Sequence, residues 1–298
     1  RTQIFGTSKF TSRLTDYKPD TLFSGVSAVD YPGSGPRLAY SYVTDNTTGD
    51  EEVHVLDISS RADKLVASDR DGCPRILCVN CYSACLRNVH MTADGNTVLY
   101  AMARNQPLYL VKSDGTGQQR LNVYQASLAP AGQRVISQAN RVVFTSSAPF
   151  GPTLTAAPTD VYIMNLDGSS IEAVTHFSAV SSVASHAVIS ANGAWIAFAL
   201  TEPAGTQVWI VRPDGTGLRW LSAGTSDASS PSISNDGNVV SYVQGGQVKQ
   251  VTGLNSPADV TRFTLSNSVS SLTSGDGRRI AALLGPPGGF AAGVYMAD

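Results

Sequence analysis

Apolar and polar residues alternate in short segments along nearly the whole chain, and tight turns separate these segments. Clear examples are LYLVK at 108–112, VYIMN at 161–165 and VWIVR at 208–212. Alternation with a period of two is typical of a β-strand that buries one of its faces. No long stretch follows the period of an amphipathic helix. The pattern therefore predicts an all-β chain.

Asp-Gly and Asn-Gly pairs mark many of the turns and fall into two interleaved series. The first series is Asp94-Gly95, Asn192-Gly193, Asp236-Gly237 and Asp276-Gly277, and the second is Asp114-Gly115, Asp167-Gly168 and Asp214-Gly215. Such a pair between alternating segments is a strong hairpin signal, because a type I′ turn needs positive φ at both of its central residues. We therefore expect a hairpin with a type I′ turn at each pair.

The two series repeat along the chain, which indicates a repeated structural unit. From position 192 to 236 is 44 residues, and from 236 to 276 is 40. Each unit contains an inner strand, a turn, two apolar strands and, after the second turn, an outer strand. This order predicts four-stranded antiparallel blades. We expect six of them, at approximately 16–68, 86–122, 124–175, 186–222, 230–264 and 269–298.

The last unit ends at GVYMAD (293–298), after its third strand. Its missing outer strand has a counterpart at the other end of the chain, because GTSKFTSRLT (6–15) resembles the outer-strand segments GTGLRWLS (215–222) and GSSIEAVT (168–175). A ring closed by strands from both ends has no free sheet edge. The expected fold is a single domain over residues 1–298, a six-bladed β-propeller whose last blade is completed by residues 1–15.

Composition and charge narrow the classes of function. Hydrophobic residues make up 42% and charged residues 15% of the chain, as expected for strands joined by tight turns. The net charge of −2 and the lack of a basic cluster argue against a nucleic-acid partner. No apolar run is long enough to predict a transmembrane segment. The chain starts at Arg1 without Met, so we expect a processed secretory protein or an excised segment, located outside the cell, in the periplasm or at the cell surface.

Four cysteines form the sharpest local feature, and all lie in the loop between the first two units. They are Cys73, Cys78, Cys81 and Cys85. Two local disulfides that staple this loop are the leading interpretation, since the cysteine count is even. A zinc site is the second, although the spacing contains a single C-x2-C pair where structural zinc sites usually have two.

An iron–sulfur cluster is the third interpretation of these cysteines. The first three have the C-x4-C-x2-C spacing of plant-type ferredoxins, but the fourth ligand in those proteins lies far downstream. Covalent c-type haem is excluded, because Tyr82 and not His follows the Cys78–Cys81 pair.

A second group of candidate residues lies where inner strands are expected to enter a central channel. Asn88, His90 and His186 fall on these inner strands, and Asp227 falls in an inter-blade loop near the channel mouth. They are candidates for binding a ligand or a metal ion. Alignment of the units places His186 level with Asn88 and Ser230, but His90 level with Val188. The two histidines are thus out of register, which weakens a shared metal site.

The remaining aromatic and ionisable residues are assigned to the scaffold. Tyr42, Tyr100, Phe144, Phe198 and Tyr242 recur at equivalent places and are predicted to be inter-blade core. His54 and His176 are expected to be structural or exposed, and Trp220 to be exposed. There is no G-x-S-x-G nucleophile elbow and no G-x-G-x-x-G before a helix, and most Asp residues are explained as turn formers. We therefore expect no cofactor, and these residues favour a non-enzymatic protein over an enzyme.

The repeats at 188–222 and 230–243 resemble those of the TolB-type β-propellers. The segments that carry the resemblance are VISANGAWIAFALTEPAGTQVWIVRPDGTGLRWLS and SPSISNDGNVVSYV. The resemblance implies a six-bladed secreted or periplasmic domain that works by binding other proteins, here without the N-terminal domain of TolB. Oligogalacturonate lyases have similar repeats and use a histidine-bound metal, but this chain lacks the necessary set of channel histidines.

Three hypotheses of function follow. The leading one is a non-enzymatic protein-binding or assembly module of the cell envelope or the extracellular space, with an unidentified protein partner. The first alternative is an enzyme or ligand binder of the lyase or hydrolase kind at the channel mouth. The second is a structural subunit of an extracellular surface assembly, in which case the chain self-assembles.

Overall fold

The computed structural model describes residues 25–31, 35–45, 50–68, 86–102, 107–151, 157–222, 224–254, 258–263, 268–284 and 293–297. Every regular element in this part of the chain is a β-strand, which confirms the all-β prediction. None of the described segments forms a helix long and apolar enough to cross a membrane. The described residues fall into two compact units, one within residues 1–123 and 130–132, the other within 124–129 and 133–298.

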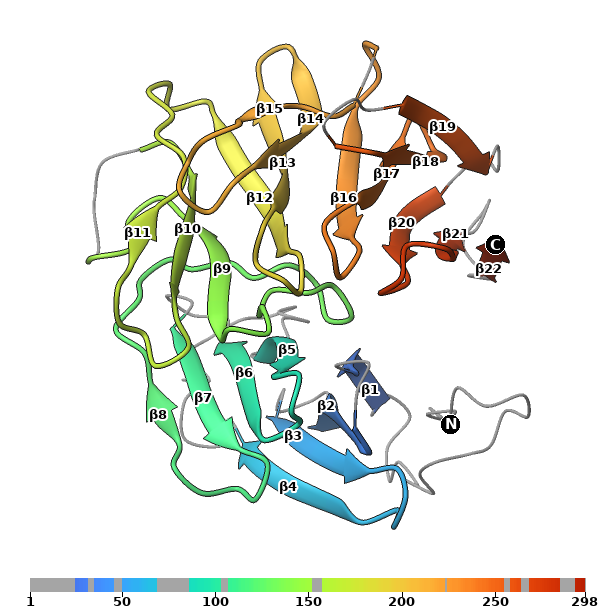
Figure 1. The fold of residues 1–298 in the computed structure, drawn as a ribbon. Coiled ribbons are helices and arrows are strands. Elements are labelled where there is room, and N and C mark those ends of the chain that lie inside the picture. Colours follow the sequence, from blue (N-terminus) through green and yellow to red (C-terminus); the bar gives the residue numbers. More distant parts are fainter. Residues whose placement is uncertain are drawn as a thin grey trace. The chain divides into compact units, whose positions relative to one another are not determined.

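The first unit contains two antiparallel sheets of four strands each, and in both the strands follow chain order (Figure 1). Sheet one consists of β1 (Gly25–Asp30), β2 (Arg37–Asp45), β3 (Asp50–Asp57) and β4 (Asp63–Ser68). Sheet two consists of β5 (Leu86–Met91), β6 (Thr97–Met102), β7 (Leu108–Lys112) and β8 (Gln119–Arg120).

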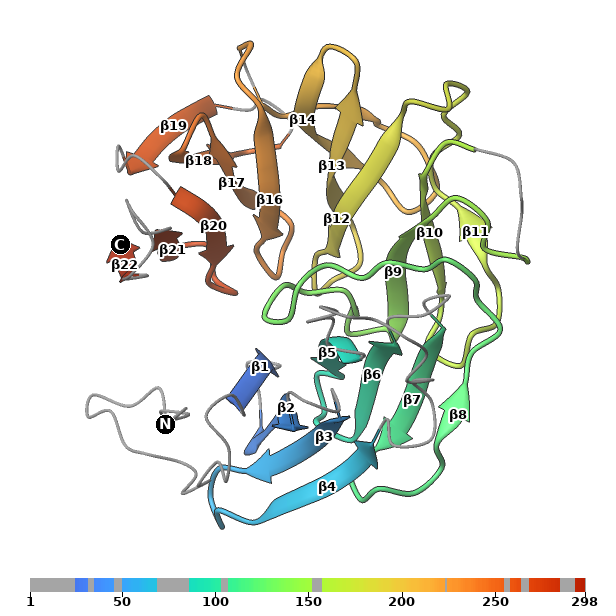
Figure 2. The same ribbon diagram turned by 180° about the vertical axis from the view of Figure 1, so that it is seen from behind.

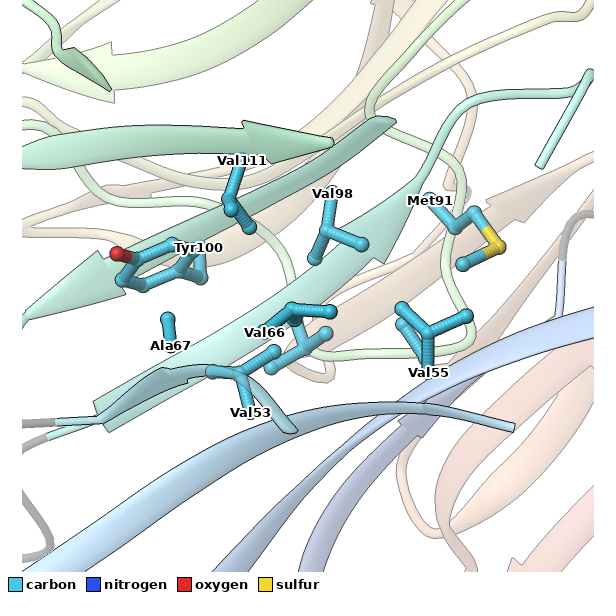
Figure 3. Packing of buried hydrophobic residues seen from close by; sticks show 10 residues of the cluster. Val53, Val55, Val66, Ala67, Met91, Val98, Tyr100 and Val111 are labelled. Atoms are coloured by element: carbon cyan, nitrogen blue, oxygen red, sulfur yellow. The ribbon is translucent and has the colours of Figure 1, made fainter. Parts of the chain in front are cut away.

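An apolar layer lies between sheets one and two (Figure 3). Sheet one contributes Val53, Val55, Val66 and Ala67, and sheet two contributes Met91, Val98, Tyr100 and Val111. Each of these side chains is at most 7% exposed. Burying one large apolar side chain stabilises a fold by roughly 1.5–3 kcal/mol. This layer therefore holds the two sheets against each other.

The second unit contains four sheets in the described residues (Figure 2). Sheet three consists of β9 (Arg141–Ser146), β10 (Asp160–Asn165) and β11 (Glu172–Ala173); sheet four of β12 (Val183–Ile189), β13 (Ile196–Glu202), β14 (Gly205–Val211) and β15 (Arg219–Trp220). Sheet five consists of β16 (Ala228–Ile233), β17 (Val239–Gln244), β18 (Gln247–Thr252) and β19 (Ala258–Phe263); sheet six of β20 (Ser268–Thr273), β21 (Ile280–Leu284) and β22 (Gly293–Ala297). Consecutive sheets pack on one another, since β12 contacts β9, β16 contacts β13, and β20 contacts β17.

Sheet three lacks a continuous innermost strand. The preceding chain meets β9 only at two isolated bridges, Ser127 with Thr145 and Ile136 with Val142. The turn that the sequence places in this unit is present, because the Ser137 N–H donates to the Arg141 carbonyl at 2.9 Å. The inner segment of sheet three therefore pairs with β9 at two separate points, whereas the inner strands of the other sheets are continuous.

The Asp-Gly and Asn-Gly pairs form hairpin turns as predicted, but the expected turn type is wrong. In each pair only the glycine has positive φ, for example 69° at Gly95 and 79° at Gly115. The Gly95 N–H donates to the Thr92 carbonyl, and the Gly115 N–H to the Lys112 carbonyl, both at 2.8 Å. Each is thus a type I turn followed by a left-handed glycine, the usual solution when a hairpin loop has more than two residues.

A shared set of side-chain hydrogen bonds explains the Ser or Thr that precedes each first-series turn. In sheet five the Ser234 hydroxyl donates to Asp236 Oδ1 at 2.6 Å and accepts from the Val239 N–H at 3.0 Å. Asp236 Oδ1 also accepts from the Asn238 N–H at 3.0 Å. Sheets two, four and six repeat these bonds with their own residues. The turn residues are therefore occupied as scaffold.

The first-series turns also bond to one another within the second unit. The Gln138 N–H donates to the Ala191 carbonyl at 2.8 Å, the Asn192 N–H to the Asn235 carbonyl at 3.0 Å, and the Asn235 N–H to the Gly275 carbonyl at 2.8 Å. These bonds run from the turn of sheet three to that of sheet six. They join the four sheets at one end through backbone groups, so they depend little on the identity of the side chains.

The five aromatic residues assigned to the core are buried, as predicted. Tyr42, Tyr100, Phe144, Phe198 and Tyr242 are all at most 2% exposed. In sheet one, however, the strand register places Tyr40 rather than Tyr42 level with the others. Tyr40 pairs with His54, three residues before the turn at Asp57, just as Tyr100 pairs with Tyr109, three residues before the turn at Lys112.

Candidate functional site

Two of the predicted inner-strand residues, Asn88 and His186, lie on β-bulges, whereas His90 pairs regularly with Leu99. The register shifts between Arg87 and Val89 on β5, between Ser185 and Val188 on β12, and between Ser229 and Ser232 on β16. The left-handed residues at these bulges are Asn88, His186 and Ser230, with φ between 52° and 56°. Alignment of the repeat units in the sequence had made these three positions equivalent. A bulge re-aims its side chain, and left-handed backbone at a residue other than Gly is uncommon.

His186 is half-buried, and its Nδ1 atom has no hydrogen-bond partner. Burial lowers the pKa of His186, which favours the neutral ring. His90 is 1% exposed on β5, two residues after Asn88. Asn88 and His90 belong to the first unit, while His186 and Asp227 belong to the second. That these four residues share one site stays a prediction.

Asp227 has a clear structural contact. Its Oδ1 atom accepts a hydrogen bond from the backbone N–H of Thr206 at 2.7 Å, close to the start of β14. A Cβ atom at Gly205 would lie 2.7 Å from the same oxygen, so the first residue of β14 needs to be glycine for Asp227 to approach. The carboxylate satisfies a backbone donor at the outer edge of a strand.

The loop that carries Cys73, Cys78, Cys81 and Cys85 lies outside the described residues. Its disulfide, zinc and iron–sulfur interpretations therefore stay predictions. Within the part of the chain that is described, no group of three or more His, Cys, Asp and Glu side chains is arranged to hold a metal ion.

The structure reveals an ionisable cluster that the sequence reasoning did not single out, on one face of sheet one. We call Tyr40, Glu52, His54 and Asp63 the His54 cluster. The Nε2 atom of His54 lies 3.1 Å from Glu52 Oε2, and its Nδ1 atom lies 3.3 Å from Asp63 Oδ1. The Tyr40 hydroxyl donates to Asp63 Oδ2 at 2.7 Å, and its ring stacks on His54 with the centroids 5.1 Å apart. His54 is only 7% exposed.

Opposing effects set the pKa values in this cluster. Burial works to lower the pKa of His54, but the hydrogen bonds and charges of Asp63 and Glu52 outweigh it and raise that pKa above its ordinary value. Burial alone would raise the pKa of Asp63, yet the hydrogen bonds from His54 and Tyr40 bring it below its ordinary value. The cluster thus favours a protonated histidine between two carboxylates.

The position of His54 in the repeat shows what is unusual about it. Tyr109, Tyr162 and Trp209 occupy the corresponding third-strand position in sheets two, three and four. Tyr109 and Tyr162 stack on their second-strand partners with ring centroids 5.4 and 5.6 Å apart. The sequence signal for the cluster was EVHVLD, in which Glu52 and His54 fall on the same face of a strand. Local alternation does not show that Asp63 lies beside them, because that depends on the pairing of β3 with β4.

A second departure from the repeat lies at the outer edge of sheet four, and we call it the β15 patch. It consists of Trp209, Leu218 and Trp220, together with Trp195, Arg212 and Arg219. Trp220 is 63% exposed, which confirms the prediction for this residue, and Leu218 is 41% exposed. Trp220 meets Trp209 edge to face, with ring centroids 5.5 Å apart.

Two arginines of the β15 patch share one aromatic ring. The guanidinium carbon of Arg212 lies 4.5 Å, and that of Arg219 5.4 Å, from the ring centroid of Trp195. Within the described residues neither arginine makes an ion pair with a carboxylate. The Nε and Nη2 atoms of Arg219 are buried without a hydrogen-bond acceptor. The charge of Arg212 also helps to lower the pKa of the nearby Asp214, after the hydrogen bonds that Asp214 accepts from Thr216.

Comparison with known proteins shows the fold and no more. No family model and no curated protein matches the chain. Among solved structures it is similar to TolB from Acinetobacter baumannii, with 17% identity and a TM-score of 0.55, covering 87% of this chain and 60% of that one. It is also similar to an oligogalacturonate lyase in complex with manganese, with 10% identity and a TM-score of 0.63, covering 90% of this chain and 73% of that one.

A third similar structure is described as the β-propeller domain of a protease from Pyrococcus furiosus. Its identity is 13% and its TM-score 0.60, covering 92% of this chain and 79% of that one. These likenesses, together with antiparallel sheets that follow one another along the chain, show a propeller-type fold. Because proteins with different activities share the fold, it does not indicate what this chain does.

Proposed function

We propose that the chain is a non-enzymatic protein-binding or assembly module, resembling the TolB-like propellers, that works in the cell envelope or the extracellular space. The β15 patch is the observation that carries this proposal. Trp and Arg are the residues most enriched at binding hot spots, where a few well-packed side chains supply most of the affinity. Here an exposed Trp220 is held in place by Trp209, and an arginine pair lies beside it on Trp195.

The charge of the patch specifies the chemistry of the partner. The exposed Arg212 offers its guanidinium group to an anion, and Trp220 with Leu218 offers apolar area in the same patch. A guanidinium binds a carboxylate through two parallel hydrogen bonds. We therefore infer that the partner surface carries Asp or Glu side chains next to an apolar anchor.

The experiment is a selection from a displayed random-peptide library with the purified chain, followed by binding measurements on the enriched peptides. We expect enrichment of sequences with Asp or Glu beside Leu, Phe or Trp. The Trp220→Ser and Arg212→Gln variants should each weaken binding of these peptides at least about tenfold, which is a loss of about 1.4 kcal/mol.

The matched control is Phe150→Ser, because Phe150 is 72% exposed but lies outside the patch. That variant should bind the selected peptides as the wild type does. Selected peptides that lack acidic residues, or whose binding survives Trp220→Ser, would overturn the patch as the binding surface. Light scattering of the free chain distinguishes the structural-subunit alternative, in which Trp220→Ser abolishes self-association instead.

A second candidate function is ligand or metal binding, with lyase- or hydrolase-like activity, at the bulged inner strands. The left-handed backbone of His186 and its unpaired Nδ1 atom favour it, and the similar lyase structure contains manganese. Calorimetric titration with Mn²⁺ and an assay for oligogalacturonate cleavage test this candidate. If it is correct, His186→Gln removes the binding heat; a chain that binds no Mn²⁺ and cleaves nothing counts against it.

We propose that the six sheets are the blades of one closed propeller, with residues 6–15 completing the blade that contains β20–β22. The chain order of the sheets and the three described strands of sheet six support this arrangement.

A further inference from the structure

We propose that the β15 patch binds an extended segment of its partner by strand addition, and that apolar and acidic residues alternate along this segment. The inference rests on the proposed function and adds the binding mode and the sequence pattern of the partner. Two observations carry it. The apolar and cationic halves of the patch lie on opposite faces of sheet four, and the backbone of Trp220 is open at the edge of that sheet.

The register of sheet four separates the apolar from the cationic residues of the patch. Residues that pair directly across antiparallel strands lie on the same face, and the next residue along each strand lies on the other face. Trp220 pairs with Trp209, which pairs with Phe198, so these three rings share one face. Arg219 is the neighbour of Trp220 along β15, but it pairs with Ile210 and therefore lies on the opposite face.

Contacts with the neighbouring sheets agree with this division. The ring centroid of Phe198 lies 6.3 Å from that of Phe177, which follows the outer strand of sheet three. On the other face, both arginines of the patch lie over the ring of Trp195. A Cβ atom at Gly237, in the turn of sheet five, would lie 2.9 Å from Trp195 Cδ1. A partner surface that lies flat against one face of sheet four therefore reaches only one half of the patch.

The backbone of Trp220 is open at the outer edge of sheet four. The Leu221 N–H donates to the Val208 carbonyl at 2.9 Å, so this amide points toward β14. Because the direction alternates along an antiparallel strand, the N–H and C=O groups of Trp220 point away from β14. β15 is the last strand of its sheet, and these two groups make no hydrogen bond to another described residue (Figure 1). An added strand finds a donor and an acceptor at the residue that also carries the exposed ring.

Strand addition lets one segment contact both halves of the patch. In an added strand, the residue opposite Trp220 falls on the face of the Trp220 and Trp209 rings, and its direct neighbours fall on the face of Arg219 and Arg212. Backbone bonds at the edge supply affinity in this mode, and alternate side chains supply specificity. Trp220 favours an apolar residue opposite it, and the exposed Arg212 favours Asp or Glu at odd spacings from that residue.

The experiment measures the binding of short synthetic peptides to the full chain by fluorescence anisotropy. The first peptide alternates Phe and Asp. The second has the same composition, but its residues are grouped in pairs (Phe-Phe-Asp-Asp), so acidic residues fall on both faces of an added strand. We expect the alternating peptide to bind at least about tenfold more tightly than the paired one. Arg212→Gln should remove this preference, because the acidic side chains then lose their cation.

Methylation of the peptide backbone tests the added strand itself. Two versions of the alternating peptide carry N-methyl groups, one version on every Phe and the other on every Asp. Alternate N–H groups of an added strand point toward β15 and away from it, so only one version should lose binding. The other version should bind as the unmodified peptide does. Because their composition and charge are identical, each version is the matched control for the other.

A charge exchange tests the contact at Arg212. The Arg212→Glu chain should bind a peptide that alternates Phe and Lys more tightly than the peptide that alternates Phe and Asp, because opposite charges across an interface set partner choice. The wild-type chain should show the reverse preference. The same preference in both chains would contradict a contact between Arg212 and the acidic residues.

The outcomes separate this inference from the proposed function. If binding depends on Trp220 but the two methylated versions behave alike, whether both bind or neither does, strand addition is wrong and the proposed function stands. Equal affinity of the alternating and paired peptides would overturn the expected pattern in the same way. If no peptide binds the wild-type chain more tightly than the Trp220→Ser chain, the proposed function itself fails.

Discussion

Single glycines in the first-series turns serve the neighbouring sheet as well as their own. Gly237 has a φ of 75°, and a Cβ atom there would lie 2.9 Å from Trp195 Cδ1 and 3.3 Å from Ser190 Cβ. Both of these residues belong to the turn of sheet four. The glycine is therefore needed twice, for the left-handed backbone of its hairpin and for the close approach of the next turn.

Gly237→Ala should lower the free energy of unfolding by about 1–3 kcal/mol, because the new methyl group meets Trp195 and the backbone is strained. Urea unfolding followed by tryptophan fluorescence measures this change. Gly151→Ala is the matched control, since nothing lies within 4 Å of its Cβ position. Equal stability of the two variants would show that the turns do not depend on close contact between sheets.

At the scale of elements, a hydroxyl group that follows the short outer strand accepts a hydrogen bond from the neighbouring strand in sheets three and four. The neighbouring strands are β10 and β14. The Val208 N–H donates to Ser222 Oγ at 3.0 Å, and the Val161 N–H donates to Thr175 Oγ1 at 2.9 Å. The outer strands β11 and β15 have only two residues each. The side chains thus satisfy donors that a longer outer strand would pair, which leaves fewer groups open to another chain.

Ser222→Ala should therefore lower the free energy of unfolding by about 1–3 kcal/mol, because the buried Val208 N–H loses its acceptor. Ser222→Thr should be close to neutral, since Thr175 makes the same bond in sheet three. Chemical denaturation of both variants provides the comparison. A Thr variant as unstable as the Ala variant would mean that volume, not the hydroxyl group, matters at this position.

At the scale of the whole molecule, the structure gives six consecutive sheets in the described residues, while closure of the ring and the state of the cysteines remain predictions. Both concern segments outside the described residues, namely 1–15 and the loop with Cys73 to Cys85. Each can be tested without knowledge of a binding partner.

Deletion of residues 1–15 should lower the thermal midpoint if residues 6–15 complete the last blade, because sheet six would then expose an unpaired edge. Each kcal/mol lost corresponds to about 2–4 °C for a chain of this size class. Deletion of residues 1–5 alone is the control and should leave the midpoint unchanged. Equal midpoints for the two deletions would contradict ring closure by this segment.

Thiol titration of the denatured, unreduced chain, together with metal analysis, decides among the interpretations of the four cysteines. Two disulfides give no free thiol and no bound metal. Stoichiometric zinc or iron would contradict the disulfides and favour a metal site. Four free thiols without metal would contradict all three interpretations.

Much of the fold was predictable because it depends on local sequence patterns. Alternation gives the strands, Asp-Gly pairs place the hairpins, and the repeat gives equivalent positions such as Asn88, His186 and Ser230. The turn type was not predictable from the pair alone. Whether Asp94 adopts positive φ depends on the loop length that the Thr92 and Asn96 hydrogen bonds select.

The sequence by itself determined the all-β class, the order of the hairpins and the burial of the recurring aromatic residues, because each depends on neighbours within a few positions along the chain. Only the tertiary structure decided the His54 cluster and the β15 patch. Asp63 reaches His54 through the pairing of β3 with β4, and Arg212 and Arg219 meet over Trp195 through the folding of sheet four. Register and side-chain packing across strands make these contacts, and neither is encoded in local periodicity.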